Sequence, residues 1–482
     1  MLGTTMCSGR QSRPRPCRRV AHSLISGMII ASLLALTACS GVAQGFGLRG
    51  TQVTDAMLCP DKSKRTDGPI TIVDLWWPFQ RDLLNSAAPA FNCEFPDIAI
   101  NLSVNGQVGD DSNGKLLAAV SARKPPDLVM AYDDVLTAWA AKGLLQPIDD
   151  RLPALGIRKD DYIAGAWDST LWRDHQYGIP ADWDPDSLLW YNKALFAEAG
   201  LDPERPPTTW QEVQEYAAKI DKIGPGGKIE RLGLIPWSGW QFNYIQLAQQ
   251  FNAPLHTGMD PDRVVLDSPQ MRQVFEYQYE IAKKYGGGDR INAFLTVSGA
   301  QGAASDPLLS GRVGMRLIGD WQLAYQEMVG TEVFRSTMGV TAMPPPPGGR
   351  PFLTHSGWAF MVPRGAQNVD AALTFSEWLL RTENFGTYVG PANGWLPAKK
   401  ETRSQPYLTS DPTWRKILEI DARLPQEPWL PPSPILAQYY RFADAAQSDM
   451  TSLVGTPEQV LVKAQRQLED ARDNAVAAGV YD

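Results

Sequence analysis

The sequence predicts an α/β fold made of strand–helix units. Short runs of β-branched and apolar residues alternate along the chain with longer segments of helical spacing. This alternation is typical of βα units around a parallel sheet. The chain has 482 residues, which is too long for one compact core, so we expect two lobes or one large domain. We find no internal repeat.

The alternation is clearest in the first third of the chain. The run ITIVDLWW at 70–77 is rich in β-branched residues and predicts the first strand. Gly143 follows a helical segment as a natural C-cap. The expected strands are 70–77, 98–104 and 127–131, and the expected helices are 81–91, 114–122 and 133–142.

The same pattern continues towards the C-terminus. Thr209 is a plausible N-cap for a helix after two prolines. The last helix has the strongest signal, because Thr456 can cap it, Pro457 fits its first turn and Gln459 completes a capping box. The further expected elements are helices at 191–199, 210–223 and 270–285, a strand at 313–318 and a new helix after Gly319.

The N-terminal residues 1–38 are expected to be an export signal. Five arginines and no acid precede an apolar stretch at 24–36 that is short for a membrane span. The ending Leu36-Thr37-Ala38-Cys39 resembles the bacterial lipobox, in which the cysteine is acylated and becomes the new N-terminus. We therefore expect a lipid on Cys39, a flexible tether over 39–66, and a protein held at the outer face of the cell membrane. An ordinary signal peptide that happens to carry a cysteine is the alternative.

Charge and cysteine content narrow the class of protein. The net charge is −8, and loss of the basic signal makes the mature chain more acidic, which argues against nucleic acid as a partner. Besides Cys39, the mature chain keeps Cys59 and Cys93, an even pair in an oxidising compartment. We expect a disulfide between them, with two buried free thiols as the alternative.

The familiar signatures of cofactor and metal chemistry are missing from the sequence. It has no phosphate-binding loop, no His-Glu-x-x-His and no Cys-x-x-Cys. The spacing of Asp182, Asp184 and Asp186 resembles a calcium loop but lacks the turn glycine and the final glutamate. We expect no cofactor and no metal. A secreted glycosidase would need two nearby carboxylates, and Asp182, Asp184 and Asp320 keep that alternative open.

Several segments in a fixed order resemble the family 1 extracellular solute-binding proteins of bacterial ABC sugar importers. They span about 70–400, and each is weak alone, whereas the ordered series is specific. The segments are Pro126-Asp127-Leu128-Val129, Gly143-Leu144-Leu145-Gln146-Pro147-Ile148, Tyr177-Gly178-Ile179-Pro180, the run 188–196, Pro207-Thr208-Thr209-Trp210, the run 310–315 with Gly319-Asp320-Trp321, Ser356-Gly357-Trp358, and 391–397.

This resemblance implies a two-lobed, periplasmic-binding-protein-like fold of type II, each lobe a central sheet flanked by helices, with a ligand cleft between the lobes. It implies an N-terminal lobe of 67–182 and 343–390, and a C-terminal lobe of 183–342 and 391–482. The chain would cross between lobes near 180–186, 343–347 and 390–395.

Carrying the family's ligand positions over residue by residue gives a set of aromatic and acidic candidates. Aromatic rings suit the C–H faces of a sugar, and carboxylates accept hydrogen bonds from its hydroxyls. Trp321 matches the family's stacking tryptophan most closely. The candidates are Trp77, Gln80, Asp133, Asp182, Trp183, Asp184, Trp237, Trp240, Asp320, Trp321, Gly357, Trp358 and Tyr439.

The resemblance implies a non-catalytic monomer that captures a mono- or oligosaccharide and delivers it to ABC permease subunits served by a separate ATPase. A glycerophosphodiester or polyol phosphate is the alternative ligand within the same family, and it would require a basic group in the site. A secreted glycosidase-like enzyme is the alternative from another class.

Overall fold

The computed structural model describes residues 52–77, 85–104, 110–237, 242–259, 262–296, 305–425 and 433–481, all within the unit 47–482. The expected signal, Cys39, Gln80 and Trp240 lie outside the described residues. Two five-stranded sheets organise the rest of the molecule.

The first sheet has the strand order β2-β1-β3-β16-β6. β1 pairs in parallel with β2 and β3, as the βα pattern predicts. β16 is antiparallel to both of its neighbours, so the sheet is mixed rather than parallel. Its strands are β1 (Thr71–Trp77), β2 (Ile98–Val104), β3 (Leu128–Tyr132), β6 (Gly178–Pro180) and β16 (Trp358–Met361).

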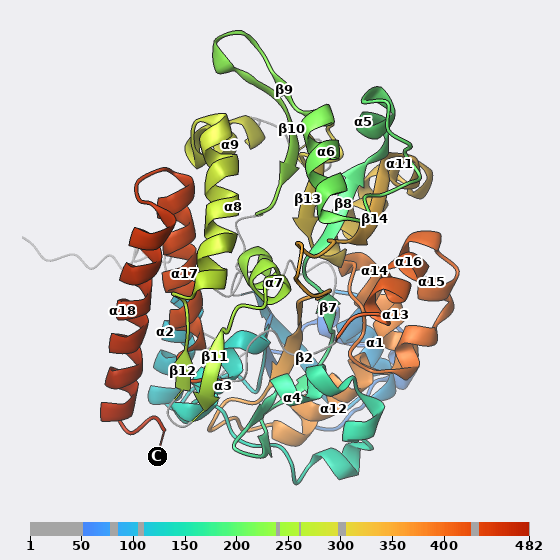
Figure 1. Ribbon diagram of the computed structural model, residues 1–482. Helices are drawn as coiled ribbons and strands as arrows, with labels where there is room; N and C mark the ends of the chain where they lie inside the picture. Colours follow the sequence, from blue (N-terminus) through green and yellow to red (C-terminus); the bar gives the residue numbers. More distant parts are fainter. Residues whose placement is uncertain are drawn as a thin grey trace, which may run out of the picture. The chain divides into compact units, whose positions relative to one another are not determined.

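The second sheet has the order β14-β8-β13-β10-β9 and is also mixed. β10 and β13 are parallel, whereas β8 is antiparallel to β13 and β14, and these four strands lie together in Figure 1. Its strands are β8 (Leu188–Asn192), β9 (Lys222–Ile223), β10 (Ile229–Ile235), β13 (Val313–Ile318) and β14 (Met338–Ala342).

The helix expected at 191–199 begins later in the structure than the sequence predicts. Tyr191 and Asn192 complete β8, and the helix α5 begins at Lys193. The Asn192 side chain accepts a hydrogen bond from the backbone N–H of Leu195 at 3.0 Å, so it is the N-cap.

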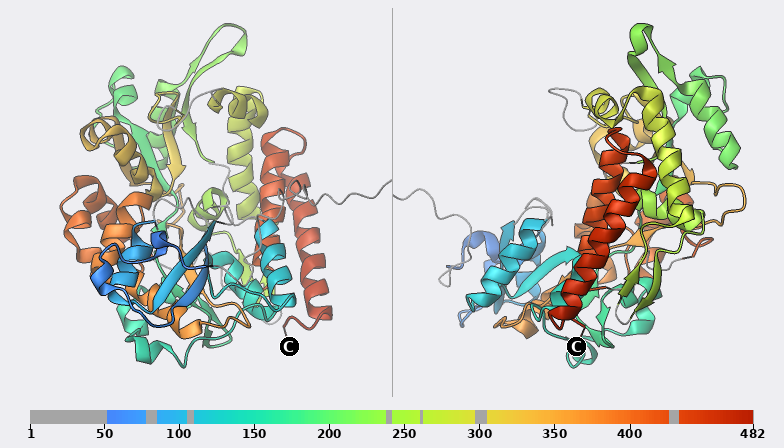
Figure 2. Two further views of the ribbon diagram at one scale, coloured as in Figure 1. Left: turned by 180° about the vertical axis from the view of Figure 1, so that it is seen from behind. Right: turned by 60° about the vertical axis from the view of Figure 1, so that its left-hand side comes forward.

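Helices pack on both sheets, and α17 and α18 lie side by side against α8 (Figures 1 and 2). The expected capping box of α18 is confirmed, with Thr456 and Gln459 bonding reciprocally. The helices are α1 (Ala87–Glu94), α2 (Asp110–Ser121), α3 (Asp133–Ala141), α4 (Ala164–Ser169), α5 (Lys193–Glu198), α6 (Trp210–Ile220), α7 (Phe242–Gln250), α8 (Pro269–Tyr285), α9 (Gly288–Leu295), α10 (Tyr325–Val329), α11 (Thr331–Thr337), α12 (Val369–Leu379), α13 (Thr382–Tyr388), α14 (Gly390–Asn393), α15 (Pro406–Thr409), α16 (Pro412–Asp421), α17 (Leu436–Thr451) and α18 (Pro457–Ala477).

A disulfide between Cys59 and Cys93 fixes the N-terminal extension to α1. The backbone N–H of Cys59 donates to the Asn92 side chain at 2.8 Å, and Arg65 donates to the Cys59 carbonyl at 2.7 Å. The described part of the segment expected to be a flexible tether, from residue 52 onward, is therefore held against the body in two 3₁₀ turns, Asp55–Met57 and Lys62–Lys64.

Two segments carry the chain between the sheets. Residues 181–187 connect β6 to β8, and residues 343–357 connect β14 to β16. Inside them, β7 (Asp184–Pro185) pairs with β15 (His355–Ser356). Residues 396–398 run alongside, since Trp183 donates to the Leu396 carbonyl at 2.8 Å and Ala398 donates to the Ala181 carbonyl at 3.1 Å. In the described residues, no helix is long and apolar enough to cross a membrane.

Candidate functional site

A group of buried acids gathers where the chain passes between the two sheets. We call these six residues the acidic cluster. Two of them begin α3 at the end of β3, three lie on the 181–187 segment, and one follows β13. All but Asp134 are less than 9% exposed. The members are Asp133, Asp134, Asp182, Asp184, Asp186 and Asp320.

Asp186 anchors a polar triad at one side of the cluster. Ser356 donates to the Asp186 carboxylate at 2.6 Å, and the Tyr132 hydroxyl donates to its other oxygen at 3.4 Å. The Ser356 and Tyr132 hydroxyls also lie within hydrogen-bonding distance of each other, so their two protons are shared among three contacts. Both oxygens of Asp186 are thus engaged, so this residue orders the end of β3 against the connecting segments.

Asp182 and Asp184 join the segments that connect the sheets. One oxygen of Asp182 accepts from the backbone N–H of Trp358 at 3.1 Å, and one oxygen of Asp184 accepts from that of Leu396 at 2.8 Å. Gly357 allows this close approach, because a Cβ there would lie 2.1 Å from the Asp182 carbonyl oxygen. The second Asp182 oxygen is buried with no backbone or basic donor among the described residues, and the only side chain that hydrogen-bonds to Asp182 there is that of Asp184.

Asp320 brings two further acceptors to the cluster. It is fully buried, and neither carboxylate oxygen accepts from a backbone or basic donor within the described part of the chain, while its side-chain hydrogen-bonding partner is another acid, Asp184. The charges of Asp184, Asp186 and Asp182 all act on the Asp320 carboxyl. The ring of Trp321 folds back over Gly319, where a Cβ would lie 2.0 Å from the indole. Buried acceptors without donors cost free energy unless a ligand or water satisfies them.

Burial raises the pKa of every member of the cluster. It is the largest cause for each, and neighbouring acid charges add to it for all except Asp184. The pKa of Asp133 rises to about 8, and those of Asp134 and Asp184 rise to about 7. Burial, followed by the charge of Asp184, holds the pKa of Asp182 well above its usual range. Near neutral pH the cluster is therefore partly protonated, and its carboxyls can both donate and accept.

Helix α17 contributes aromatic and acidic groups that face the start of α3. The charges of Asp134 and Asp133 act on Tyr440, and the charge of Asp444 acts on Asp134. Burial raises the pKa of Asp444 to about 7. Tyr439 is fully buried in the core beside α17, and its hydroxyl has no hydrogen-bonding partner in the described residues.

Arg403 is the basic side chain whose charge acts on Asp184 and Asp320, and its N–H donors already have acceptors. It binds the Asp421 carboxylate, and it donates to the carbonyls of Trp183 and Pro397 at 2.8 Å each. Asp421 also contacts His355 at 2.5 Å. Arg403 lowers the pKa of Asp184 and Asp320 less than burial raises them. This arginine holds the backbone of the connecting segments in place.

The structure separates the predicted ligand residues into two groups. It brings together the acids and the residues on the connecting segments: Asp133, Asp182, Asp184, Asp320, Trp321, Gly357 and Trp358. It encloses the others in hydrophobic cores, where Trp77 lies against Phe360, Trp183 stacks on His355, and Trp237 and Tyr439 are also buried.

Five residues of this region were not among the predicted ligands. They are Asp134, Asp186, Tyr132, Ser356 and Asp444, and all are joined to the cluster by hydrogen bonds or charge. Asp134 and Tyr132 directly flank the predicted Asp133, so the turn from strand to helix offered a usable signal. Asp444 offered none, because its position depends on how α17 packs.

The match to a family model decides the family. The model described as bacterial extracellular solute-binding protein matches residues 80–384, more than half of the chain. The chain belongs to this family. The resemblance noted from the sequence motifs is confirmed, and so is the mixed α/β, two-lobed periplasmic-binding-protein fold class.

Solved structures and curated relatives of this solute-binding protein agree with that assignment. CpMnBP1 with mannotriose bound has a TM-score of 0.73 and 26% identity, covering 82% of this chain and 99% of the other. The sugar-binding protein MalE from Xanthomonas citri has a TM-score of 0.69 at 19% identity, covering 85% and 99%, which shows the fold alone.

The names of the curated relatives give a ligand that is different from the sugars named in the solved structures. The sn-glycerol-3-phosphate-binding periplasmic protein UgpB of Escherichia coli is 29% identical over 218 residues, or 42% of this chain and 48% of UgpB. UgpB of Shigella dysenteriae is 27% identical over 219 residues, with the same shares. The chain thus spans about half the length of the curated relatives it matches.

Proposed function

We propose that this protein is a non-catalytic binding protein that captures a neutral carbohydrate and delivers it to an ABC importer. The observation that carries the proposal is that buried carboxylate oxygens of Asp133, Asp182 and Asp320 have no backbone or basic donor among the residues the structure describes. A sugar hydroxyl can donate to an ionised carboxylate or accept from a protonated carboxyl, so it suits these acids in either state. Trp321 and Trp358 would offer ring faces beside them.

The CpMnBP1 complexes support a carbohydrate, since their names give mannotriose and mannobiose as the bound molecules. The second candidate ligand is a glycerophosphodiester or polyol phosphate, favoured by the name of UgpB. A phosphate would sit among six acids, and Arg403 is already engaged by Asp421 and two carbonyls. The like charges of the acids disfavour an anion there, and the other buried arginine, Arg316 on β13, is next to Asp306 and Tyr325, so we place the sugar first.

The wider arrangement follows from the same proposal. The lobes would be 67–182 with 343–390 and 183–342 with 391–482, and the membership of the strands in two sheets supports this division. Lobe closure over the sugar would present the closed form to the permease subunits, whose ATPase is a separate protein. The chain would act as a monomer, exported and anchored by a lipid on Cys39.

Thermal unfolding of the acyl-free protein against neutral oligosaccharides and glycerophosphodiesters tests the proposal. A ligand present at 100 times its dissociation constant adds about 2.7 kcal/mol to the free energy of unfolding. A saturable rise in Tm with a sugar that is recovered intact supports it. A rise with glycerophosphodiesters alone would replace the sugar by a phosphate ligand. Cleavage of the sugar during incubation would establish an enzyme instead.

A further inference from the structure

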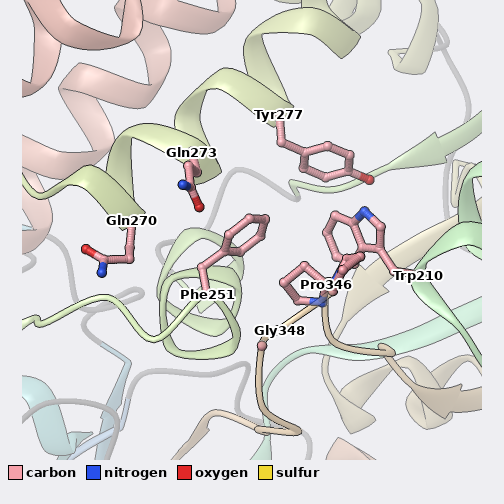
Figure 3. Close-up of a pocket in the computed structure, with 9 residues that line it drawn as sticks. Trp210, Phe251, Gln270, Gln273, Tyr277, Pro346 and Gly348 are labelled. Atoms are coloured by element: carbon pink, nitrogen blue, oxygen red, sulfur yellow. The ribbon is translucent and has the colours of Figure 1, made fainter.

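A pocket whose lining includes none of the acidic cluster residues lies on the part of the molecule built around the second sheet. It has a volume of about 440 Å³ and is formed by the start of α6, the end of α7, the first turns of α8 and the loop 346–349. Small-molecule sites typically measure about 300 to 1,000 Å³. Figure 3 shows the rings of Phe251, Tyr277 and Trp210 gathered beside Pro346, with Gln273 of α8 next to Phe251 and Gln270 further along the same helix, its carboxamide turned away from the rings. The lining residues are Trp210, Phe251, Gln270, Gln273, Tyr277, Pro346, Pro347, Gly348 and Gly349.

Three aromatic side chains form a fixed surface in this pocket. The ring centroids of Trp210 and Tyr277 are 4.9 Å apart, and those of Trp210 and Phe251 are 5.7 Å apart with the rings nearly perpendicular. All three rings pack partly buried against the core beneath them. The Tyr277 hydroxyl accepts from Gln214 at 3.0 Å, which holds that ring in place. A rigid aromatic surface suits the C–H face of a sugar ring.

Two carboxamides lie on the helix that also carries Tyr277. Gln270 and Gln273 are three residues apart on α8 and so lie on the same side of it. Among the described residues, the structure gives neither carboxamide a hydrogen bond to the protein. Each carboxamide has a donor and an acceptor, which is the pair of functions that neighbouring sugar hydroxyls need.

The opposite wall is a loop whose backbone is held close to α7. A Cβ on Gly349 would lie 2.3 Å from the Gln250 carbonyl oxygen, and Arg350 donates its backbone N–H to the same carbonyl at 3.0 Å. Asn252 donates to the Gly348 carbonyl at 3.3 Å. The pocket is thus bounded on this side by a fixed backbone, and none of the lining residues that the structure describes is acidic or basic.

We propose that this pocket is a second binding site, for one ring of a neutral carbohydrate. The ring's C–H face would pack on Trp210 and Phe251, and its hydroxyls would bond to Gln270 and Gln273. An uncharged lining gives no counter-charge to a phosphate, a uronate or an ammonium group. The site shares no residue with the acidic cluster and does not depend on which ligand that cluster binds.

Saturation-transfer NMR with mannotriose tests this site in a Trp321→Ala background, which removes the predicted stacking residue of the first site. We expect binding there, and we expect the added pair Gln270→Ala and Gln273→Ala to weaken it at least tenfold. Glu276→Ala, an exposed change on the same helix outside the lining, is the matched control and should leave it unchanged.

Absence of binding by mannotriose, maltotriose and cellotriose in that background would overturn the proposal, as would binding that the glutamine pair does not weaken. Binding of a proline-rich peptide instead of any sugar would assign the pocket to a protein partner and also overturn it.

The wild-type chain gives an independent measurement that does not rely on folding of a variant. A diazirine-bearing methyl mannoside should label peptides of α8 or the Trp210 region, and labelling confined to other segments would contradict the site. If the function proposed for the acidic cluster is wrong, the thermal unfolding of the wild-type protein with sugars shows this separately.

Discussion

The Asp184 carboxylate accepts a hydrogen bond from the backbone N–H of Leu396 at 2.8 Å, across a sequence separation of 212 residues. Asp182 does the same for Trp358. Both acids were predicted as ligand residues from the sequence resemblance, and the structure gives each of them a bond that holds one connecting segment against another. The same side chains therefore support the connecting segments and, in the function proposed above, would also face the ligand.

Replacement of Asp184 separates its backbone bond from its charge. Asp184→Ala leaves the Leu396 N–H buried without an acceptor, which should lower the free energy of unfolding by about 1–3 kcal/mol. Asp184→Asn keeps an acceptor and removes a buried charge, so we expect a much smaller loss. Urea unfolding at pH 7 measures both, and equal losses for the two variants would contradict the role of this bond.

Gly357 should tolerate no side chain. A Cβ at this position would lie 2.1 Å from the Asp182 carbonyl oxygen, so Gly357→Ala must displace backbone in the connecting segments. We expect a loss of several kcal/mol, as is found for severe strain or overpacking in a core. Gly114→Ala is the matched control, because no atom lies within 4 Å of its Cβ and it sits within α2. This control should stabilise by roughly 0.5–1 kcal/mol.

Trp321→Ala should abolish most sugar binding. The Trp321 indole lies over Gly319, next in sequence to Asp320. The variant would therefore lack the ring face proposed for stacking. Because Trp321 also packs against two hydrophobic cores, some loss of Tm is expected as well. Trp172→Ala removes an indole from the small β4 (Leu171–Trp172) hairpin and should leave binding intact. Calorimetric affinities equal to the wild-type value in Trp321→Ala would exclude this residue from the site.

Stability should fall as the pH rises from about 5 to 8. The folded-state pKa of Asp133 is about 8 and those of Asp134, Asp184 and Asp444 are about 7, whereas all four titrate near 3.8 when unfolded. In that window the folded protein binds more protons than the unfolded chain, so raising the pH favours unfolding. Tm measured across this range should decline, and the double variant Asp133→Asn, Asp134→Asn should flatten the decline. A wild-type Tm that rises between pH 5 and 8 would contradict this prediction.

Local signals predicted most of the regular elements. The bounds of β2 and β13 match the sequence expectation, and the α18 capping box is read directly from Thr456 and Gln459. The boundary at Asn192 was missed because a fully buried strand and the start of a helix are both apolar there. The antiparallel direction of β16 was also missed, since it depends on contacts with β3 and β6 that are distant in sequence.

The site was predicted only in part, for a related reason. Acids look alike in sequence, so Asp186 could not be told from Asp184 until Tyr132 and Ser356 were placed beside it. Trp77 is the converse case. It is only 1% exposed and lies against Phe360, so a residue expected at the end of a strand serves the core. Tertiary packing decided both.

The disulfide between Cys59 and Cys93 has a practical consequence for anyone who produces this protein. It closes a loop with a sequence separation of 34 residues, and restricting the unfolded chain in this way is worth about 3 to 4 kcal/mol in the loop-entropy model. Material made in a reducing cytosol would lack that contribution, and its N-terminal extension would be held mainly by Arg65 and Asn92. Such preparations should melt at a lower temperature and lose the extension to proteases, whereas secreted or oxidatively refolded protein should keep it.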